Sequence, residues 1–322
     1  MIKHENFPLS TILYYRIGGT ARFLLEAFHR EDVLRAIDFA SAQRVERLVV
    51  VGLGSNLLFP DGHFDGAVLR IMSAGPHQIR AAGNGLVDVF AGETLDDVIG
   101  FGFQQGYAGL EWAGGLPGTV GAAVRGNVGA FGGEFKDVLE RAEVLEIAPA
   151  GPRIGSWSNA DLRFSYRDSA VKQNRALLVL SATLKLRCAS PDELERAREI
   201  YRSHIEYRHQ NHPMDYPTCG SVFKNVDGRD QVARILAVWP DIREAVENRW
   251  HGKVSMGYII NRLGLAGFRI GRAQVSTKHK NFIVNLGGAC FSDVNGIIEE
   301  IKERVFATFG FVPEVEVEIV GG

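Results

Sequence analysis

Apolar residues recur along this chain with two periods, one typical of helices and one typical of strands. Helical spacing and capping signals predict four helices, at residues 30–43, 94–106, 190–207 and 292–310. Short β-branched or alternating runs predict strands, at residues 48–51, 86–91, 138–147, 176–186, 281–285 and 314–319. The two kinds of element are mixed along the chain without an internal repeat, which favours an α+β fold.

Several helix ends carry their own signals. Thr94 is a plausible N-cap, and Gly106 ends that helix. Ser190 is followed three residues later by Glu193, which forms a capping box. Gly310 is the expected stop of the last helix, the most regular one in the chain. The tail at residues 314–319 alternates strictly, so it is expected to have one acidic and one apolar face.

Composition narrows the class of protein. The chain has 322 residues, of which 46% are hydrophobic and 23% charged, so it can bury a substantial core and is not disordered. A formal net charge of -2 argues against a uniformly basic nucleic-acid binder. Three widely spaced cysteines without metal-ligand spacing predict reduced thiols and no metal site. No signal peptide or run of about 18 apolar residues is present, so a soluble cytoplasmic protein is expected.

The chain is rich in glycine, with 37 residues, and these glycines are gathered in clusters. The strand at residues 48–51 runs into residues 52–56, whose glycines could direct backbone N–H groups at a phosphate. Ser55 and Asn56 could add side-chain donors. The loop lacks the Lys-Ser/Thr pair of a Walker motif and the third glycine of a dinucleotide fingerprint. A tight exit from a strand explains it equally well.

A second glycine block spans residues 114–123 within a segment, residues 112–133, that shows almost no helix or strand pattern. Small side chains over ten positions would let the backbone lie flat against a planar ring or a diphosphate. An irregular segment of this length is usually functional. Two such loops suit one long ligand, and the alternative is a packing interface between small residues.

Three further positions carry candidate chemistry. Arg167 follows Tyr166 in an irregular segment and suits recognition of a carboxylate or phosphate, although a surface pair with Asp168 is the simpler explanation. Ser221 lacks the surroundings of a nucleophile, so it is a proton donor or a turn residue. Cys219 has no identifiable base nearby in the sequence and is expected to be a buried small hydrophobe. The residues alone identify no reaction.

Seven blocks taken in order resemble the UDP-N-acetylenolpyruvoylglucosamine reductase family, the flavoenzymes of peptidoglycan precursor synthesis. The resemblance runs from about Tyr15 to Gly321. The blocks are RIGGTA at 16–21, GLGSNLL at 52–58, GLEWAGGLPGTVGAAVRGNVGAFGGE at 109–134, FSYRDS at 164–169, PTCGSVFKN at 217–225, AQVSTKHKNFIVN at 273–285 and FGFVPEVEVEIVG at 309–321. Several blocks in the correct order are far more specific than one glycine loop.

The resemblance implies an α+β fold with the two-subdomain FAD-binding architecture of the vanillyl-alcohol-oxidase class and a C-terminal substrate domain. It places the first FAD-binding subdomain at residues 1–73. The second would span residues 74–200, joined by the C-terminal strand at 312–322. The substrate-binding domain would span residues 201–311.

The resemblance also implies NADPH-dependent, FAD-mediated reduction of the enolpyruvyl ether of UDP-N-acetylglucosamine. Ser221 matches the family's proton donor, and Arg167 and Glu314 match residues that flank the developing enolate. The FAD-binding positions would be Gly52, Leu53, Gly54, Ser55, Asn56, Pro117, Gly118, Thr119, Gly121 and Ala122. The substrate-binding positions would be Tyr166, Lys224, Asn225, Lys253 and Lys278. A cytoplasmic monomer without nucleic-acid or membrane partners is expected.

Departures from the family pattern bear on the nucleotide. Leu53 stands where glycine is common, and Asn211 and Ala266 stand where lysines that contact the substrate diphosphate are frequent. The long segment between residues 225 and 256 contains Trp239 and Trp250, and Trp250 or a neighbour is expected to cover the uridine. Two other functions stay open: a flavin-dependent alcohol or lactone oxidase of the same fold, and a non-catalytic paralogue that binds flavin or a sugar nucleotide.

Overall fold

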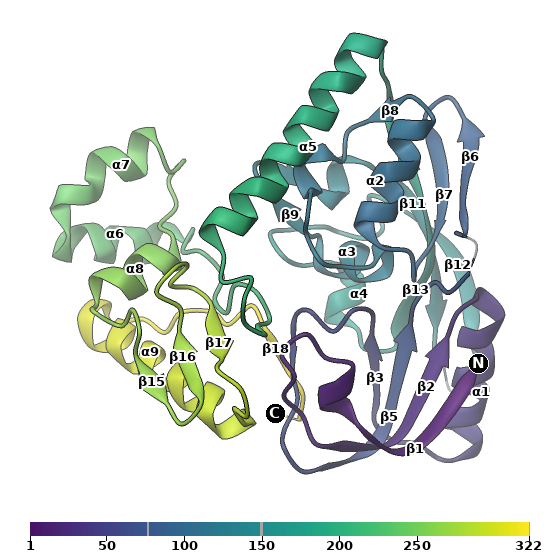
Figure 1. Cartoon of the computed structure of the whole chain (residues 1–322), viewed down its shortest axis with the longest axis horizontal. Coiled ribbons are helices and arrows are strands. Elements are labelled where there is room, and N and C mark those ends of the chain that lie inside the picture. The colour runs from purple at the N-terminus through teal and green to yellow at the C-terminus, as the bar shows by residue number, and fades with distance from the viewer. Residues whose placement is uncertain (76, 149–150, 322) are drawn as a thin grey trace. The chain divides into compact units, whose positions relative to one another are not determined.

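The computed structural model of the chain describes residues 1–75, 77–148 and 151–321 (Figure 1). These residues form two compact units. The first unit consists of Met1–Phe7, Ala21–Leu53 and Phe64–Gln210. The second consists of Pro8–Thr20, Gly54–His63 and Asn211–Gly322, of which the last residue is outside the described part. The three-domain division expected from the sequence stays a prediction.

The first unit contains a four-stranded sheet with helix α1 (Arg30–Ala42) on one face. Its strand order is β1-β2-β5-β3, with bounds β1 Ile2–Pro8, β2 Thr20–Ala27, β5 His63–Ile71 and β3 Leu48–Val51. Helix α1 has the predicted apolar spacing, and Val33 and Ile37 are buried against the core residues Leu25 and Leu69. Each such side chain contributes roughly 1.5–3 kcal/mol by leaving water.

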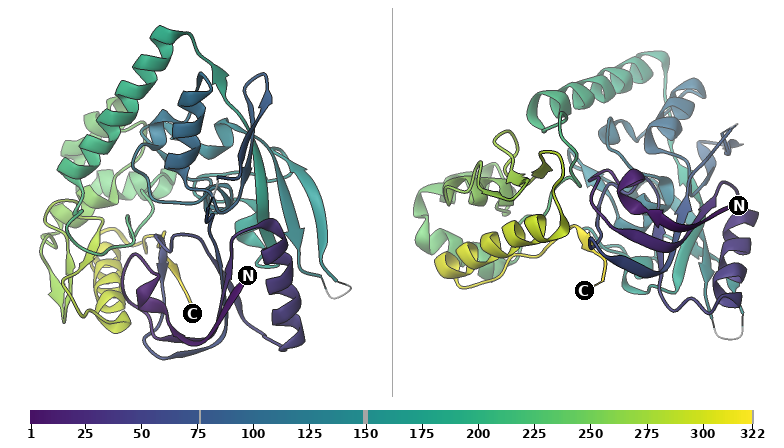
Figure 2. Two further views of the ribbon diagram at one scale, coloured as in Figure 1. Left: turned by 45° about the vertical axis from the view of Figure 1, so that its right-hand side comes forward. Right: turned by 60° about the horizontal axis from the view of Figure 1, so that its bottom comes forward.

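A five-stranded antiparallel sheet completes the core of the first unit. Its order is β12-β11-β13-β7-β6, with bounds β12 Arg153–Ser158, β11 Leu139–Glu146, β13 Leu177–Lys185, β7 Leu86–Phe90 and β6 Ile79–Gly83. Figure 2 shows helices α2 (Leu95–Gln104) and α3 (Val120–Gly126) on one side of it. Thr94 caps α2 as predicted, because its Oγ1 accepts from the backbone N–H of Asp97 at 3.1 Å.

The prediction that residues 112–133 lack regular structure is wrong. This segment contains α3, and a pair of two-residue strands, β9 (Gly129–Ala130) and β10 (Gly133–Glu134), lies at its end. Smaller elements of the unit are β8 Tyr107–Ala108, η2 Glu111–Ala113, η3 Phe135–Asp137, α4 Ala170–Gln173 and β14 Arg187–Cys188. Helix α5 (Pro191–Asn211) begins at the predicted capping box and extends past the predicted end.

The second unit has its own core, centred on helix α9 (Phe291–Phe309), which ends at the predicted Gly310. Its three-stranded sheet consists of β15 Arg269–Ile270, β16 Ala273–Val275 and β17 Ile283–Asn285. The remaining elements are η1 Leu9–Thr11, α6 Arg229–Val238, η4 Pro240–Ile242, α7 Arg243–Asn248 and α8 Met256–Arg262.

The C-terminal tail is less regular than its alternation predicted. Only Glu318–Ile319 form a strand, β18, which pairs in parallel with β4 (Leu57–Leu58). Val315 makes a single bridge to Phe223. Other backbone bonds hold the rest of the tail outside a regular ladder, such as that from the N–H of Glu316 to the carbonyl of Val222 at 2.7 Å. Val317 is buried, as expected for the apolar face.

Candidate active site

Both glycine loops contribute to one place in the first unit. A Cβ atom added to Gly52 would lie 2.4 Å from Oγ1 of Thr119, so the end of β3 lies directly against the second loop. Thr119 is itself buried and bridges Thr94. The backbone carbonyl of Gly118 accepts from the N–H of Leu95 at 3.1 Å. Gly52, Leu53 and residues 117–122 are therefore brought together, as the hypothesis of a shared ligand requires.

The remaining residues of the first loop belong to the second unit. The carbonyl of Gly54 accepts from the N–H of Tyr14 at 3.2 Å, and Gly54 has a φ of +68° that favours glycine. Nδ2 of Asn56 donates to the carbonyl of Glu316 at 3.2 Å. The predicted phosphate-binding loop at residues 52–56 is thus shared by the two units: Leu53 belongs to the first and Gly54 to the second.

The backbone of the second glycine loop is held by hydrogen bonds on one side, and at Gly118 it has open space on the other. The backbone N–H groups of Val120 and Gly121 donate to the carbonyls of Glu93 and Ala91, both at 2.9 Å. A Cβ atom added to Gly118 would meet only Leu95 Cδ1, at 3.9 Å. Close approach to a diphosphate or a flat ring requires firmly held backbone with an open face, which Gly118 provides, so these residues fit FAD.

Arg167 lies in a tight turn that packs on the far end of the glycine block. Its guanidinium donates to the carbonyl of Gly129 and lies over the ring of Tyr166, 5.1 Å from the centroid. The backbone of Arg167 is left-handed, with a φ of +55°. Buried Asn127 fixes the turn by donating through Nδ2 to the carbonyl of Ser165 at 2.8 Å. Such an over-determined conformation is typical of functional loops.

Lys224 and Glu314 are brought together in the second unit, and Ser221 lies three residues before Lys224 on the same segment. Ser221 forms a bridge with Phe282, and the N–H of Lys224 donates to the carbonyl of Glu314 at 2.9 Å. The ammonium of Lys224, which is largely buried, forms an ion pair with the exposed carboxylate of Glu314. Gly220 has a φ of +81°, which sets the turn before Ser221. The serine therefore stands on fixed backbone.

The other predicted substrate residues are more dispersed in this unit. Oδ1 of Asn225 accepts from the N–H of Met256 at 3.1 Å, at the start of α8. Nζ of Lys253 lies 3.9 Å from Oδ2 of Asp227, and both side chains are exposed. Lys278 is exposed, and its backbone N–H donates to Oγ of Ser276 at 3.1 Å.

Two predictions about nearby side chains have different outcomes. Cys219 is only 2% exposed, and burial raises the pKa of its thiol to about 12, so it is the inert hydrophobe expected from the sequence. Trp250 is half-buried and packs its ring against Tyr258, with centroids 5.1 Å apart. Its role in covering the uridine stays a prediction.

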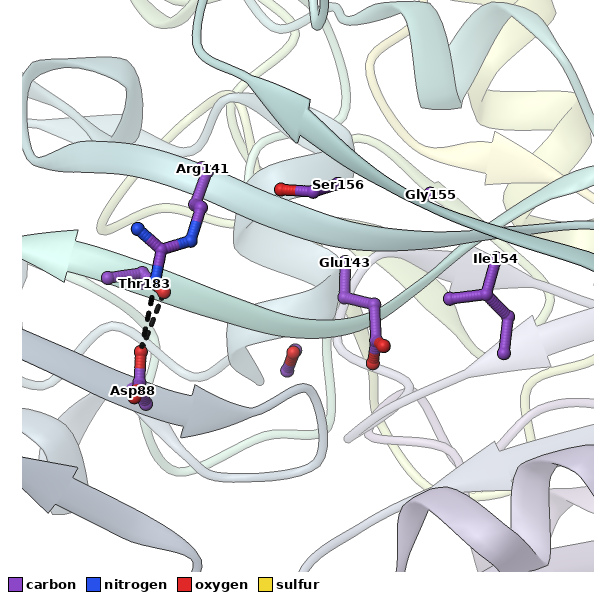
Figure 3. Close-up of a pocket in the computed structure, with 8 residues that line it drawn as sticks. Asp88, Arg141, Glu143, Ile154, Gly155, Ser156 and Thr183 are labelled. Atoms are coloured by element: carbon purple, nitrogen blue, oxygen red, sulfur yellow. Dashed lines mark hydrogen bonds and ion pairs between the residues drawn. The ribbon is translucent and has the colours of Figure 1, made fainter.

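A pocket opens on the five-stranded sheet, away from the predicted residues (Figure 3). Its charged groups already have partners. Asp88 accepts from Thr183 at 2.7 Å, and Glu143 accepts two hydrogen bonds from Arg30, both at 2.9 Å. Since none of the predicted site residues lines it, this pocket does not contribute to the candidate site.

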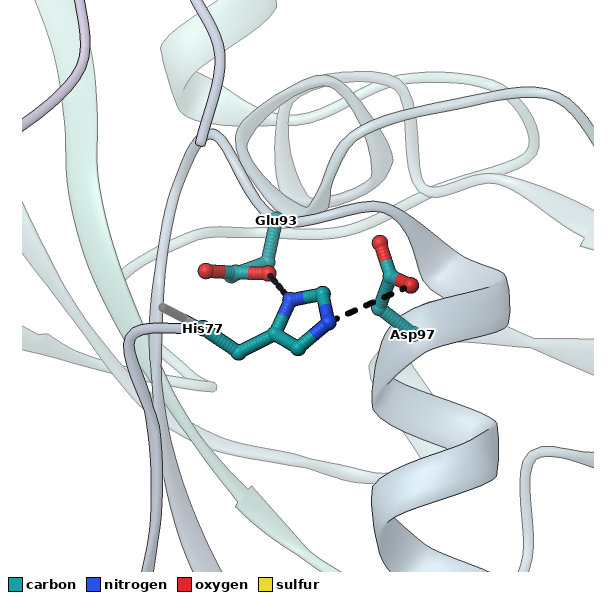
Figure 4. A group of neighbouring side chains, drawn as sticks. All are labelled: His77, Glu93 and Asp97. Atoms are coloured by element: carbon teal, nitrogen blue, oxygen red, sulfur yellow. Dashed lines mark hydrogen bonds and ion pairs between the residues drawn. The ribbon is translucent and has the colours of Figure 1, made fainter. Parts of the chain in front are cut away.

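Behind the second glycine loop lies a cluster that the sequence did not reveal, formed by His77, Glu93 and Asp97 (Figure 4). Glu93 is fully buried and accepts from Oγ of Ser73 at 2.5 Å. It also contacts Nδ1 of His77 at 3.0 Å, while Nε2 of His77 lies 3.9 Å from Asp97. Because the carbonyl of Glu93 holds Val120, the cluster supports the loop.

The charge of His77 makes this support dependent on pH. Its hydrogen bond to Glu93 and the charge of Asp97 raise the pKa of His77 above its usual value. Protonated His77 therefore stabilises the folded protein fully below about pH 6.5, the usual pKa of histidine. This stabilisation is lost as the pH rises through the higher pKa that His77 has in the folded state. We expect His77→Ala to lower the melting temperature by no more than about 2 °C at acidic pH, because the ring is 60% exposed. The difference should shrink at alkaline pH; a difference independent of pH would contradict this role.

Two known protein families match separate parts of the chain. Residues 21–150 match the FAD binding domain family, and residues 212–320 match the C-terminal domain of UDP-N-acetylenolpyruvoylglucosamine reductase. Among the described residues, no helix combines the length and the apolar character needed to cross a membrane.

Relatives of the same name cover the chain almost completely. The UDP-N-acetylenolpyruvoylglucosamine reductase of Caldicellulosiruptor bescii is 33% identical over 320 residues, covering 98% of this chain and 90% of its own length. The enzyme of Gloeobacter violaceus is 33% identical over 97% of this chain and 94% of its own length. The crystal structure of the Thermus caldophilus enzyme superimposes with a TM-score of 0.72 at 28% identity, covering 99% of this chain and 98% of that one. The chain belongs to the UDP-N-acetylenolpyruvoylglucosamine reductase family.

Proposed function

We propose that Ser221, Arg167 and Glu314 carry out proton transfer and charge stabilisation in the reaction of this family. The chain is an FAD-dependent oxidoreductase that uses NADPH to reduce UDP-N-acetylglucosamine enolpyruvate to UDP-N-acetylmuramate, in peptidoglycan precursor synthesis. The observation that carries the residue assignment is the fixed backbone on which Ser221 stands, in the segment whose Lys224 forms an ion pair with Glu314.

FAD would be held by Gly52 to Asn56 and by Pro117 to Ala122. When bound, FAD would supply the hydride chemistry between NADPH and the methylene carbon of the enolpyruvyl group. The open face at Gly118 and the rigid support behind it favour this assignment. Leu53, which replaces a common glycine, would keep its side chain away from the ligand.

The protein's own groups complete the reaction around the other carbon of the double bond. Hydride addition develops negative charge on the substrate carboxylate, where the guanidinium of Arg167 would stabilise it. The hydroxyl of Ser221 would then donate its proton to the adjacent carbon. A serine of ordinary acidity suffices, because an enolate carbon is a far stronger base than an ether. Glu314 is the third residue that the resemblance assigns to this step.

Lys224, Asn225, Lys253, Lys278 and Tyr166 would bind the sugar nucleotide. Lysine is a suitable partner for a diphosphate or carboxylate. Since Asn211 and Ala266 cannot supply the lysine charges common in the family, other cations must hold the diphosphate. The enzyme is proposed to act as a cytoplasmic monomer without nucleic-acid partners; its three free cysteines suit a reducing compartment.

Absorption spectroscopy tests the function against both alternatives. NADPH should bleach the flavin of the purified protein anaerobically, and the enolpyruvyl sugar nucleotide should restore its absorbance without oxygen. Restoration by oxygen alone would favour an alcohol or lactone oxidase. A protein that binds the sugar nucleotide but never restores the spectrum would be a non-catalytic paralogue.

A further inference from the structure

Arg208, near the end of α5, has a guanidinium that forms no ion pair among the described residues. The residue is only 7% exposed. Its Nε donates to the carbonyl of Gly114 at 2.9 Å, but its buried Nη2 has no hydrogen-bond partner. Burial lowers the pKa of Arg208, but arginine remains charged at neutral pH. An unpaired buried cation is costly, so the protein retains it at the expense of stability.

The surroundings of Arg208 explain why nearby residues do not neutralise it. Asp96, the acid with most electrostatic influence on it, already accepts from the hydroxyl of Tyr201 at 3.0 Å and from the N–H of Gly115 at 3.3 Å. A Cβ atom added to Gly114 would lie 2.6 Å from the carbonyl of Tyr201. The guanidinium is therefore packed on the start of the glycine block that leads into residues 117–122.

An exposed aromatic ring lies beside this cation. Phe131 is 44% exposed and has a left-handed backbone, with a φ of +50°. Its ring is stacked on His204, with centroids 3.9 Å apart and planes 3° apart. The guanidinium carbon of Arg208 is 5.2 Å from the same ring centroid. Tyr207, also on α5, meets the same ring edge-on, with centroids 5.4 Å apart and planes 86° apart. Phe131 nevertheless keeps its exposed surface beside the three α5 side chains.

We propose that Arg208 and Phe131 form a nucleotide-binding subsite, in which the guanidinium binds a phosphate oxygen and the exposed ring stacks on the base. A cation that lacks an anion and a flat apolar surface next to it match the two parts of a nucleoside diphosphate. The inference rests on the proposed function, because FAD, NADPH and the UDP sugar all carry this group. It would also supply a positive charge for diphosphate binding in a chain that has Asn211 and Ala266 in place of lysines.

Arg208→Met in the full-length protein tests the cationic half. We expect the affinity for inorganic pyrophosphate, UDP or ADP, measured by calorimetry, to fall by about 10- to 100-fold. The amount of FAD retained on purification should fall if FAD is the ligand. The melting temperature of the ligand-free protein should be unchanged or higher, because an unpaired buried charge is removed. Arg202→Met is the matched control, since Arg202 lies on the same helix, is 65% exposed and pairs with Glu195.

Three measurements on the Arg208→Met protein identify which nucleotide occupies the subsite. Loss of flavin per protein indicates FAD, a higher KM for NADPH alone indicates NADPH, and a higher KM for the sugar nucleotide alone indicates the substrate. A lower melting temperature with all affinities unchanged would overturn the subsite and leave Arg208 a structural residue. The KM values need turnover, but binding of pyrophosphate, UDP and ADP does not, so the calorimetric result is independent of whether the proposed reaction occurs.

Phe131→Ala tests the aromatic half separately. The variant should bind UDP and ADP more weakly and inorganic pyrophosphate as the unchanged protein does, because pyrophosphate has no base to stack. Equal weakening of all three probes, or of none, would contradict a stacking role for the ring.

Discussion

Ser221→Ala is expected to slow transfer of reducing equivalents to the enolpyruvyl sugar by about 10²- to 10⁴-fold, the usual contribution of a positioned acid. Reduction of the flavin by NADPH should stay within about twofold of the unchanged enzyme, because that step needs no proton from the protein. Rapid-mixing absorption measurements of the two half-reactions, made separately, check this selectivity.

The control for Ser221 is a neighbouring hydroxyl with a structural partner. Oγ1 of Thr218 donates to the carbonyl of Ile283 at 3.0 Å, so Thr218→Val disturbs the same segment without removing the proposed acid. This variant should lose stability, and any loss of rate should affect both half-reactions alike. If Ser221→Ala behaves in the same way, Ser221 supports the fold and another group supplies the proton.

The elements that the sequence predicted well are those whose signals are local. The capping threonine at Thr94 and the left-handed Gly310 act on their own helix ends, so they can be identified without knowledge of the rest of the fold. The β-branched run at residues 48–51 likewise forms β3. Such features depend on a few neighbouring residues, and the structure confirms them.

Helix α3 was missed because its stability comes from elsewhere in the fold. Val120–Gly126 contains two glycines and two β-branched valines, all weak helix formers. The helix is held by backbone bonds to the turn after β7 and by packing against β13. Tertiary contacts override local propensity here, and single-residue preferences contain no sign of them.

Some residues of the candidate site could likewise be predicted from local sequence, and others could not. Spacing identified the glycine loops and suggested Arg167 as an anion partner. It left the role of Ser221 open and gave no reason to prefer one residue of the tail's acidic face, so only the family resemblance assigned roles to Ser221 and Glu314. Arg208 escaped notice because the predicted helix ended at residue 207, among many charged residues. Only burial distinguishes it from them, and burial is a property of the folded chain.

Substitutions in the glycine loops are expected to have large effects on stability and on FAD binding. Gly52→Ala is expected to destabilise the FAD-free protein by about 1–3 kcal/mol, because the added methyl group would overlap Oγ1 of Thr119. Thr119→Ala should recover part of this loss in the double variant, since it removes the atoms closest to the new Cβ. Urea unfolding of the two single variants and the double variant measures the coupling between the loops.

Gly118→Ala separates ligand contact from packing, because a Cβ at this position meets only Leu95 Cδ1, at the ordinary distance of 3.9 Å. The FAD-free protein should unfold as before, while FAD binds at least about tenfold more weakly if the ligand lies against this backbone, a loss of about 1.4 kcal/mol. Fluorescence titration of the FAD-free protein with FAD measures the affinity directly. Unchanged affinity would show that the open face of Gly118 is not where the cofactor binds, and the FAD-binding role of residues 117–122 would fail with it.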